Sequence, residues 1–391
     1  MIFQALDDKE SCVAICVNGE LYYEDFPELT GTWDYNSTLH HPGIEYAKIY
    51  CEGAKIDEVC PEDLKPVWKI TSEKIRAFIV SFAESRVSLS EHCIYDMIPK
   101  RFLLDYFSIK NEITSHILTT RSKPKNYDFL LNLTILANKL EKQTLNLDLG
   151  YFNKNLGDYK ARRFRKTALN NNRISYNIYG TKTGRLTTNK NSFPILTLNK
   201  EFREIIKPRN DYLVELDYNA AELRVLLGLA NKTQPEEDIH EWNIKNIFGD
   251  NVTREEAKKR AFAWLYNPES EDYLLNRAFD RDKVLKKYWD GQQVNNPYDR
   301  TIAADKHHAL NYIIQSTASD LFLRKMIAID KILKDRKTFI SFSIHDSLVL
   351  DFSSEDSDIL AKIVQEFSDT DLGKFKVNVK YGKNFKNMLI V

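Results

Sequence analysis

The spacing of hydrophobic residues changes several times along the chain, and each change indicates a different kind of element. In residues 1–60, short apolar runs flank Asn18-Gly19, a dipeptide typical of β-hairpin turns. The apolar residues then recur at helical spacing from Leu64 to Ser88 and again from Cys93 to about Thr119. A third helix is expected just after Pro124, because proline is strongly disfavoured inside a helix.

Strands and helices follow one another without a regular repeat in the rest of the chain. The segment ISYNIYGTKTGRLTT predicts strands bent at Gly180 and Gly184, and the apolar strand YLVELD runs straight into the helix AAELRVLLGLA. Residues 238–290 are mostly helical in pattern, residues 302–334 predict one long helix, and FISFSIHDSLVL predicts a strand hairpin. Few strands and many helices predict an α+β fold.

Charge is distributed unevenly, although the net charge of the 391-residue chain is zero. Residues 1–100 contain 9 basic and 18 acidic side chains, whereas residues 101–200 contain 18 basic and 6 acidic side chains. Such asymmetry favours a polyanion as the partner of the basic segment, with a solvated helix face as the ordinary alternative. The densest basic stretch, KARRFRK, supplies the candidate DNA-binding residues Lys160, Arg162 and Arg163.

The sequence lacks the apolar segments that membranes require. No stretch of about 18 apolar residues occurs, so we expect no membrane span and no membrane partner. The first residues, MIFQALDDKE, lack the basic and apolar regions of a secretory signal, so we expect a cytoplasmic protein. The 5 cysteines are irregularly spaced, which favours reduced thiols over a disulfide framework.

Two aspartates lie where a carboxylate needs a partner. Asp217 ends an apolar strand just before a helix, and Asp346 lies at the tip of the predicted hairpin, neither with a basic residue close in sequence. An unpaired buried carboxylate is strongly destabilising. If strand pairing brings the two together, their oxygens suit Mg²⁺, and two ions about 4 Å apart would activate an attacking oxygen and stabilise a leaving one. Each aspartate alone fits the simpler role of capping a turn or a helix start.

One predicted helix carries cations and aromatic rings on the same face. In TREEAKKRAFAWLYNP, the residues that recur every four positions are Arg254, Lys258, Phe262 and Tyr266. The two cations suit a triphosphate, and the two rings offer flat faces on which a base can stack. The neighbouring glutamates leave a solvated helix as the alternative.

Together these segments resemble the family A DNA polymerases (the DNA polymerase I family) over roughly residues 95–391. LDYNAAELR resembles motif A, TREEAKKRAFAWLY resembles the fingers-helix motif B, and IHDS resembles motif C. TGRL, DIH and NYIIQSTASD match further elements of the family in its order. Any one match is weak, but their common order and internal spacing are specific.

The resemblance implies roles for individual residues. The implied ligands of two Mg²⁺ ions are the side chains of Asp217 and Asp346 and the carbonyl of Tyr218. The residues implied to contact the incoming nucleotide are Arg254, Lys258, Phe262, Tyr266, His240 and Glu222. Among these, Lys258 would donate a proton to the leaving pyrophosphate, and Glu222 would act as a steric gate against a ribose 2′-hydroxyl. The residues implied to contact primer and template are Arg185, Asn311, Gln315 and His345.

The resemblance also implies a fold and an activity. The fold is a right-hand polymerase with an antiparallel palm sheet and a small N-terminal α+β module. Its expected parts are the module (1–95), the thumb (96–172), the first palm part (173–237), the fingers (238–300) and the second palm part (301–391). The implied activity is template-directed DNA synthesis in replication, in which dNTPs are added to a primer 3′-hydroxyl. The compact chain favours a bacteriophage-type enzyme, which would act in the host cytoplasm.

Departures from the family pattern are confined to a few positions. Ser347 stands where the family usually has a glutamate after the motif C aspartate, and we expect the two aspartates to suffice. Asn267 and Pro268 follow the motif B tyrosine, so we expect the helix to end there.

Three other functions fit the sequence less well. A single-subunit RNA polymerase is disfavoured by Glu222 and by the aromatic residue Phe262, and a reverse transcriptase by the single aspartate of IHDS. A catalytically silent nucleic-acid-binding protein is disfavoured because both aspartates and both helix cations are present.

The first 95 residues are too few for the 3′–5′ exonuclease domain that many relatives carry. Asp8-Lys9-Glu10 has the form of a first exonuclease motif, but no convincing later motif follows, so we expect no full exonuclease domain. An acidic module that docks replication proteins, or one that braces the thumb, is expected instead, and the sequence does not choose between the two.

Overall fold

The computed structural model describes residues 2–6, 12–17, 20–22, 44–46, 56–87, 94–120, 126–155, 157–249, 251–267 and 269–391. The chain forms two compact units, residues 1–127 and residues 128–391. Asn18-Gly19 and Asp8-Lys9-Glu10 lie outside the described residues, so the expectations for these positions stay predictions. Within the described parts, none of the helices combines the length and the apolar character needed to cross a membrane.

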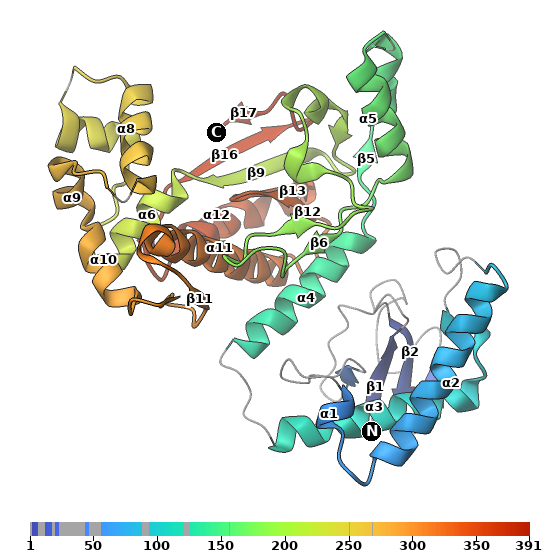
Figure 1. Cartoon of the computed structure of the whole chain (residues 1–391). Coiled ribbons are helices and arrows are strands. Elements are labelled where there is room, and N and C mark those ends of the chain that lie inside the picture. The colour runs from blue at the N-terminus through green and yellow to red at the C-terminus, as the bar shows by residue number, and fades with distance from the viewer. Residues whose placement is uncertain are drawn as a thin grey trace. The chain divides into compact units, whose positions relative to one another are not determined.

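The first unit combines a small sheet with two long helices (Figure 1). Its strands are β1 (Ile2–Leu6), β2 (Cys12–Val17), β3 (Glu20–Tyr22) and β4 (Ile44–Tyr46), in the order β3-β2-β1-β4. Strands β2 and β3 pair antiparallel, as the predicted hairpin requires, whereas β4 lies parallel to β1. Its helices are α1 (Ile56–Val59), α2 (Lys65–Glu84), a 3₁₀ turn (Ile94–Met97) and α3 (Lys100–Thr120).

Helix α3 belongs to the first unit, although residues 96–172 were expected to form the thumb. Helix α3 packs against α2 and contacts β1 and β3. Its apolar residues Phe107, Ile113 and Ile117 are almost fully buried. Because α3 buries this face within the first unit, the compact units divide after residue 127 rather than after residue 95.

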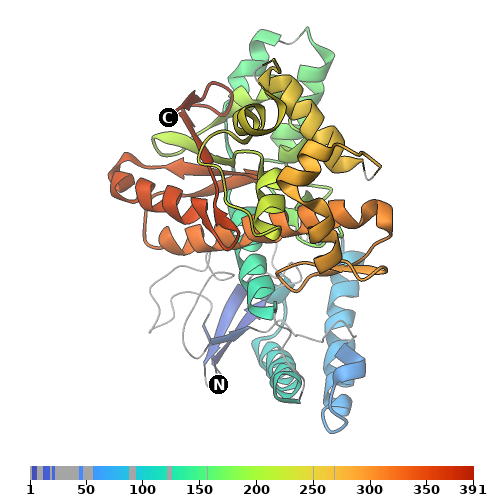
Figure 2. The ribbon, with the colours of Figure 1, turned by 90° about the vertical axis from the view of Figure 1, so that its left-hand side faces the viewer.

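A five-stranded antiparallel sheet lies at the centre of the second unit (Figures 1 and 2). In spatial order its strands are β12 (Phe339–Ile344), β13 (Ser347–Phe352), β9 (Tyr212–Tyr218), β16 (Val377–Gly382) and β17 (Leu389–Ile390). Helices α11 (Lys306–Ile332) and α12 (Leu360–Ser368) lie along one face. Every residue of β13 is buried, so the other face of this strand is covered as well. The predicted α+β fold with an antiparallel sheet and the predicted hairpin are both confirmed.

A group of short helices lies at one end of the sheet (Figure 1). These elements are α6 (Ala221–Leu229), α7 (Ile239–Asn243), a π turn (Ile244–Phe248), α8 (Arg254–Tyr266), α9 (Tyr273–Phe279) and α10 (Arg281–Tyr288). Helix α8 begins with a capping box formed by Thr253 and Glu256. It ends where the sequence predicts, with Asn267 as its C-cap, and Arg281 Nη1 donates to the Trp264 and Asn267 carbonyls at 3.2 Å each.

The remaining elements of the second unit are shorter, apart from two helices. They are α4 (Tyr127–Lys142), β5 (Asn146–Leu147), α5 (Tyr159–Asn170), β6 (Tyr176–Asn177), β7 (Thr187–Thr188), β8 (Ile206–Lys207), β10 (Gln293–Asn295), β11 (Thr301–Ala303), β14 (Asp369–Thr370), β15 (Gly373–Lys374) and 3₁₀ turns at Leu149–Asn155, Ile195–Thr197, Lys200–Ile205 and Ser354–Ile359. Strands β6 and β7 enclose the predicted bends. Gly184 has a φ of +78°, and an added Cβ would lie 2.5 Å from the Arg300 guanidinium, so this turn requires glycine.

Gly228 gives a test of the packing around α6. Its ideal Cβ position lies 2.5 Å from Leu372 Cβ and 2.8 Å from the Leu372 carbonyl oxygen. A Gly→Ala change inside a helix normally stabilises by about 1 kcal/mol, but overpacking costs about 1–3 kcal/mol. We expect Gly228→Ala to lower the Tm by about 2–6 °C in thermal unfolding. The matched control is Gly157→Ala, because nothing lies within 4 Å of that position; equal Tm values for the two variants would contradict the close packing.

Candidate active site

Asp217 and Asp346 come from neighbouring strands of the central sheet. Asp217 lies in β9 directly opposite Ser347, the first residue of β13. Asp346 precedes Ser347 in the turn from β12, so strand pairing brings both carboxylates to one end of the sheet. Ser347 Oγ donates a hydrogen bond to Asp217 Oδ1 at 2.7 Å. The serine that departs from the family pattern therefore orients one of the two aspartates.

Burial raises the pKa of both carboxyl groups above the ordinary value. For Asp217, hydrogen bonds from Ser347 and Asn378 oppose this rise of the pKa. For Asp346, the Arg185 guanidinium opposes the rise of the pKa, whereas the charge of Asp217 adds to it. The two aspartates thus form a pair of like charges, which a bound cation would relieve.

The oxygen donors at this end of the sheet suit a hard divalent cation. Asp217 and Asp346 supply carboxylates, and the next residue along β9, Tyr218, supplies a backbone carbonyl. Across the described ranges, no three or more His, Cys, Asp or Glu side chains gather in an arrangement that could hold a metal. Two protein carboxylates are nevertheless what Mg²⁺ commonly takes when substrate phosphates and water complete its shell.

One pocket joins Asp217 to the face of α8 that carries cations and rings. The residues that line it are Asp217, Tyr218, Asn219, Ala220, His240, Arg254, Lys258, Phe262 and Asn378. Phe262 and Tyr266 stack along the helix, with ring centroids 6.0 Å apart and 13° between the planes. His240 is 3% exposed, and its ring centroid lies 5.9 Å from that of Phe262. The spacing of four residues in α8 therefore produces a single surface that faces Asp217.

Glu222 joins three segments of the second unit. It lies in the first turn of α6 and is 7% exposed. Arg185 Nη2 donates to Glu222 Oε1 at 2.6 Å, and the Tyr266 hydroxyl donates to Glu222 Oε2. Burial and this carboxylate together raise the pKa of Tyr266. Glu222 is thus held rigidly between α8 and the turn that carries Arg185.

A second pocket lies beside Asp346. The residues that line it are Arg185, Leu186, Leu196, Ser319, Phe322, Leu323, Ser343, His345 and Asp346. His345 is exposed and has a φ of +54°, so the tight turn presents its ring at the surface. Asn311 and Gln315 precede Ser319 on α11 by two turns and one turn, which places them on the helix face that continues from this pocket.

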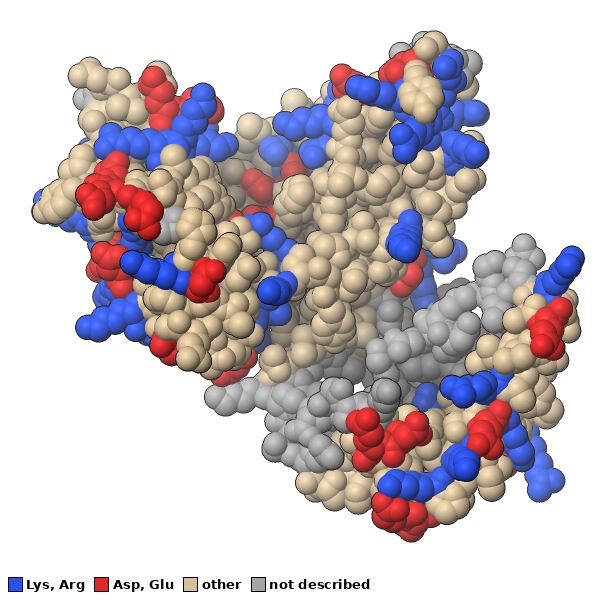
Figure 3. Space-filling view, in the orientation of Figure 1, with Lys and Arg blue, Asp and Glu red and all other residues tan. Residues whose placement is uncertain are grey.

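The basic residues of α5 lie away from both pockets. Lys160, Arg162 and Arg163 are exposed on α5, which begins at the N-cap Asp158. Figure 1 shows α5 and α8 towards opposite ends of the central sheet. In Figure 3 the surface between these sides is hollowed, with acidic side chains deep inside and Lys and Arg on both walls. The structure thus places the α5 cations on a wall of the hollow, separate from the carboxylate pair.

Sequence reasoning missed three residues that tertiary structure brings to the site. Asn378 of β16 lies opposite Asp217, and Asn219 and Asp238 meet beside Arg254. The register of β16 places Asn378 beside Asp217, and no pattern in the sequence around Asn378 indicates this position. Asp238 lies in the DIH segment, of which sequence reasoning used only His240, and its contact with Arg254 spans 16 positions.

Parts of the chain are similar in sequence to known proteins. The model of DNA polymerase family A matches residues 275–387. DNA polymerase I of Caldicellulosiruptor bescii is 24% identical over 53% of this chain and 31% of its own length. A DNA polymerase of Bacillus phage SP01 is 25% identical over 53% of this chain and 29% of its own length. The chain therefore spans about a third of the length of these curated relatives.

The fold is shared with a solved structure. The POL domain of Pol1 from M. smegmatis, in complex with DNA primer-template and dNTP, aligns with a TM-score of 0.53 and 15% identity over 73% of this chain and 75% of that domain. The second unit's central sheet and the helices around it thus share the fold of a polymerase domain. Over part of its length the chain is similar in sequence to members of DNA polymerase family A.

The raised pKa of Asp346 predicts how stability depends on pH. Between the unfolded and the folded pKa the native state binds more protons, so the free energy of unfolding falls as pH rises through that window. Asparagine mimics the protonated form, so in EDTA at about pH 8 we expect Asp346→Asn to raise the Tm by about 2–5 °C. This gain should shrink as pH is lowered towards about 4. Asp369→Asn, at an exposed position, is the control; a Tm for Asp346→Asn at or below wild type at pH 8 contradicts the repulsion.

Proposed function

We propose that the chain is a template-directed DNA polymerase that adds dNTPs to the 3′-hydroxyl of a primer. The observation that carries this proposal is that Asp217 and Asp346 meet at one end of the sheet, where Asp217 shares a pocket with Arg254 and Lys258. The names of the relatives support it, because they are DNA polymerases, and the solved neighbour is a complex with primer-template and dNTP.

Within this proposal the parts of the chain take the names of a polymerase hand. Residues 173–237 and 301–391 form the palm, and residues 238–300 form the fingers. The thumb is assigned to residues 96–172, of which the segment from residue 128 onward lies in the second compact unit. Residues 1–95 are assigned to docking of replication proteins or bracing of the thumb, and the activity to the cytoplasm, or the host cytoplasm for a viral chain.

The residues of the pocket have different roles in phosphoryl transfer. Asp217, Asp346 and the Tyr218 carbonyl would hold two Mg²⁺ ions, which when bound favour the ionised primer hydroxyl and neutralise triphosphate charge. Arg254 binds phosphate oxygens as a planar fork, and Lys258 binds them as a point charge and donates a proton to the leaving pyrophosphate.

The aromatic and polar residues position the substrates. Phe262 and Tyr266 stack against the base, and His240 contacts a phosphate. Glu222 closes the space beside the ribose. Arg185, Asn311, Gln315 and His345 contact the primer end and template, whereas Lys160, Arg162 and Arg163 bind backbone phosphates farther along the duplex.

Removal of either carboxylate tests the proposed reaction. We expect Asp217→Asn and Asp346→Asn to lower primer extension with Mg²⁺ by at least about 10³-fold, because neither variant retains both carboxylates. The Kd for primer-template DNA, measured by fluorescence anisotropy, should stay within about 3-fold of wild type because most DNA contacts are to phosphates elsewhere. Asp369→Asn should extend primers normally. Near-normal extension by either pocket variant would refute the metal-site assignment.

Glu222 tests the choice between dNTPs and rNTPs. We expect Glu222→Ala to improve the relative kcat/KM for rNTPs by about 10- to 100-fold, because the buried side chain no longer closes the space beside the ribose. Tyr266→Phe is the matched control, since it removes the hydrogen bond to Glu222 but keeps the carboxylate. Equal gains in rNTP use by both variants would assign selectivity to the hydrogen bond instead of the side chain itself. A wild-type preference for rNTPs would favour the RNA polymerase alternative.

A further inference from the structure

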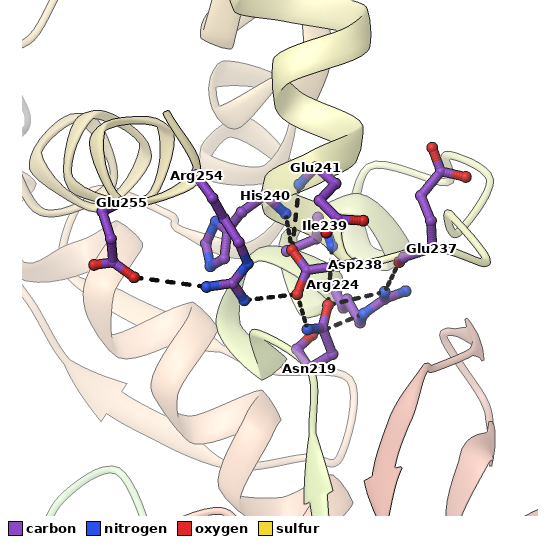
Figure 4. Close-up of polar contacts among 9 residues, drawn as sticks. All are labelled: Asn219, Arg224, Glu237, Asp238, Ile239, His240, Glu241, Arg254 and Glu255. Atoms are coloured by element: carbon purple, nitrogen blue, oxygen red, sulfur yellow. Dashed lines mark hydrogen bonds and ion pairs between the residues drawn. The ribbon is translucent and has the colours of Figure 1, made fainter. Parts of the chain in front are cut away.

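A single carboxylate joins the three segments that surround the pocket (Figure 4). Asp238 is the N-cap of α7, where Oδ1 accepts from the backbone N–H groups of His240 at 2.9 Å and Glu241 at 3.2 Å. Asp238 Oδ2 accepts from Asn219 Nδ2 and from Arg254 Nη2, both at 2.7 Å. The loop after β9, the start of α7 and the start of α8 therefore converge on one acidic side chain.

Asn219 is held in the orientation that this contact needs. It is 5% exposed, and its Oδ1 accepts from the Ile239 N–H at 2.9 Å and from Arg224 Nη2 at 3.2 Å. With the oxygen engaged by two donors, the amide nitrogen points towards Asp238 (Figure 4). The asparagine amide supplies both the acceptor and the donor that this position requires, whereas an ionised carboxylate of the same size supplies acceptors alone.

Arg224 makes the base of this arrangement rigid. Its side chain is fully buried and donates to three backbone carbonyls, those of Asn219 at 2.8 Å, Pro235 at 2.7 Å and Glu237 at 2.8 Å. These bonds connect the start of α6 to the segment that leads into Asp238. Since a buried guanidinium without partners would be strongly destabilising, all three carbonyls are held in place together.

Arg254, by contrast, lies at the exposed end of the arrangement. Its side chain is 45% exposed at the first position of α8, whereas that of Asp238 is 15% exposed. Arg254 Nη2 is engaged by Asp238, and Nη1 lies 3.7 Å from Glu255 Oε1. Hydrogen bonds from Arg254 and Asn219 hold the pKa of Asp238 well below its usual range despite partial burial, so the ion pair persists across the working pH range.

We propose that Asp238 is a positioning residue for the nucleotide triphosphate. Through its ion pair it holds the Arg254 guanidinium at the pocket beside Lys258, and through Asn219 it ties that guanidinium to the strand end that carries Asp217. The triphosphate then meets a cation that is already placed, so less side-chain freedom is lost on binding. This inference rests on the proposed polymerase function and adds to it a residue that touches neither substrate nor metal.

The variant Asp238→Asn separates charge from shape. Asparagine remains a good N-cap and keeps the size of the side chain, so α7 should still form. We expect the KM for dNTP to rise about 10-fold, with kcat changed less than about 3-fold, because the loss affects nucleotide binding in the ground state and transition state alike. The Kd for primer-template DNA should match wild type, and the Tm should fall by only a few degrees, because the ion pair with Arg254 is lost while α7 still forms. Glu241→Gln, which removes an exposed carboxylate from the same turn, is the control and should leave the KM unchanged.

A double-mutant cycle shows whether Asp238 acts through Arg254. Arg254→Ala alone should raise the KM for dNTP more than Asp238→Asn does. In the Arg254→Ala background, Asp238→Asn should change the KM less than about 2-fold, since no guanidinium remains to be positioned. Additive effects, or a KM that falls in Asp238→Asn because the carboxylate merely repels the triphosphate, would overturn the inference.

The same measurements distinguish this inference from the function on which it rests. Wild-type protein that incorporates no dNTP overturns the proposed function and the positioning role with it. Active wild type with additive KM effects overturns the positioning role alone. A third outcome is a large fall in the Tm of Asp238→Asn, with kcat and KM both changed and with no coupling to Arg254→Ala in the double-mutant cycle. This outcome would assign Asp238 to folding and would also overturn the positioning role.

Discussion

The register between β9 and β13 places two like charges side by side. Once Asp217 stands opposite Ser347, Asp346 has to lie at the same end of the sheet, because it is the residue before Ser347. Burial raises the pKa of both carboxyl groups, and for Asp346 the nearby charge of Asp217 adds to this rise of the pKa. Such a pair of carboxylates lowers the stability of the fold, but it also forms a site that attracts cations.

The surrounding structure keeps this end of the sheet from yielding to the repulsion. Ser347 and Asn378, from the strands on either side of β9, both hydrogen-bond to Asp217. The next residue, Tyr218, stacks on Phe367 with ring centroids 4.2 Å apart and 3° between the planes, and its hydroxyl donates to the Phe367 carbonyl at 2.7 Å. The hydrogen bonds that orient the Asp217 carboxylate come from uncharged groups, and the ring pair anchors the strand to α12. Because none of these contacts brings a positive charge, the carboxylate keeps its negative charge for binding a cation.

At each end of α8, one acidic side chain accepts hydrogen bonds both from the helix and from another segment of the second unit. At one end of α8, Asp238 accepts hydrogen bonds from Arg254 and Asn219. At the other end, Glu222 accepts from Tyr266 and Arg185. Hydrogen bonds to a charged group contribute about 1.5–3 kcal/mol each, roughly twice the neutral value, so two acidic residues suffice to set how the whole helix faces the sheet. Lys258 and Phe262 lie between these two attachments and line the pocket.

Features that depend on neighbours in the chain could be read from the sequence. The shared face of Arg254, Lys258 and Phe262 follows from a spacing of four, the hairpin around Asp346 from two apolar runs, and the end of α8 from Asn267 and the proline after it. Other features needed the folded chain. The bond from Ser347 to Asp217 spans 130 positions, and strand register, which local sequence barely encodes, decides it. The ion pair of Asp238 with Arg254 depends on how two helix starts approach each other, and the division after residue 127 depends on where α3 buries its apolar face. Periodicity and turn chemistry are local properties, whereas contacts between distant segments depend on the packing of the whole unit.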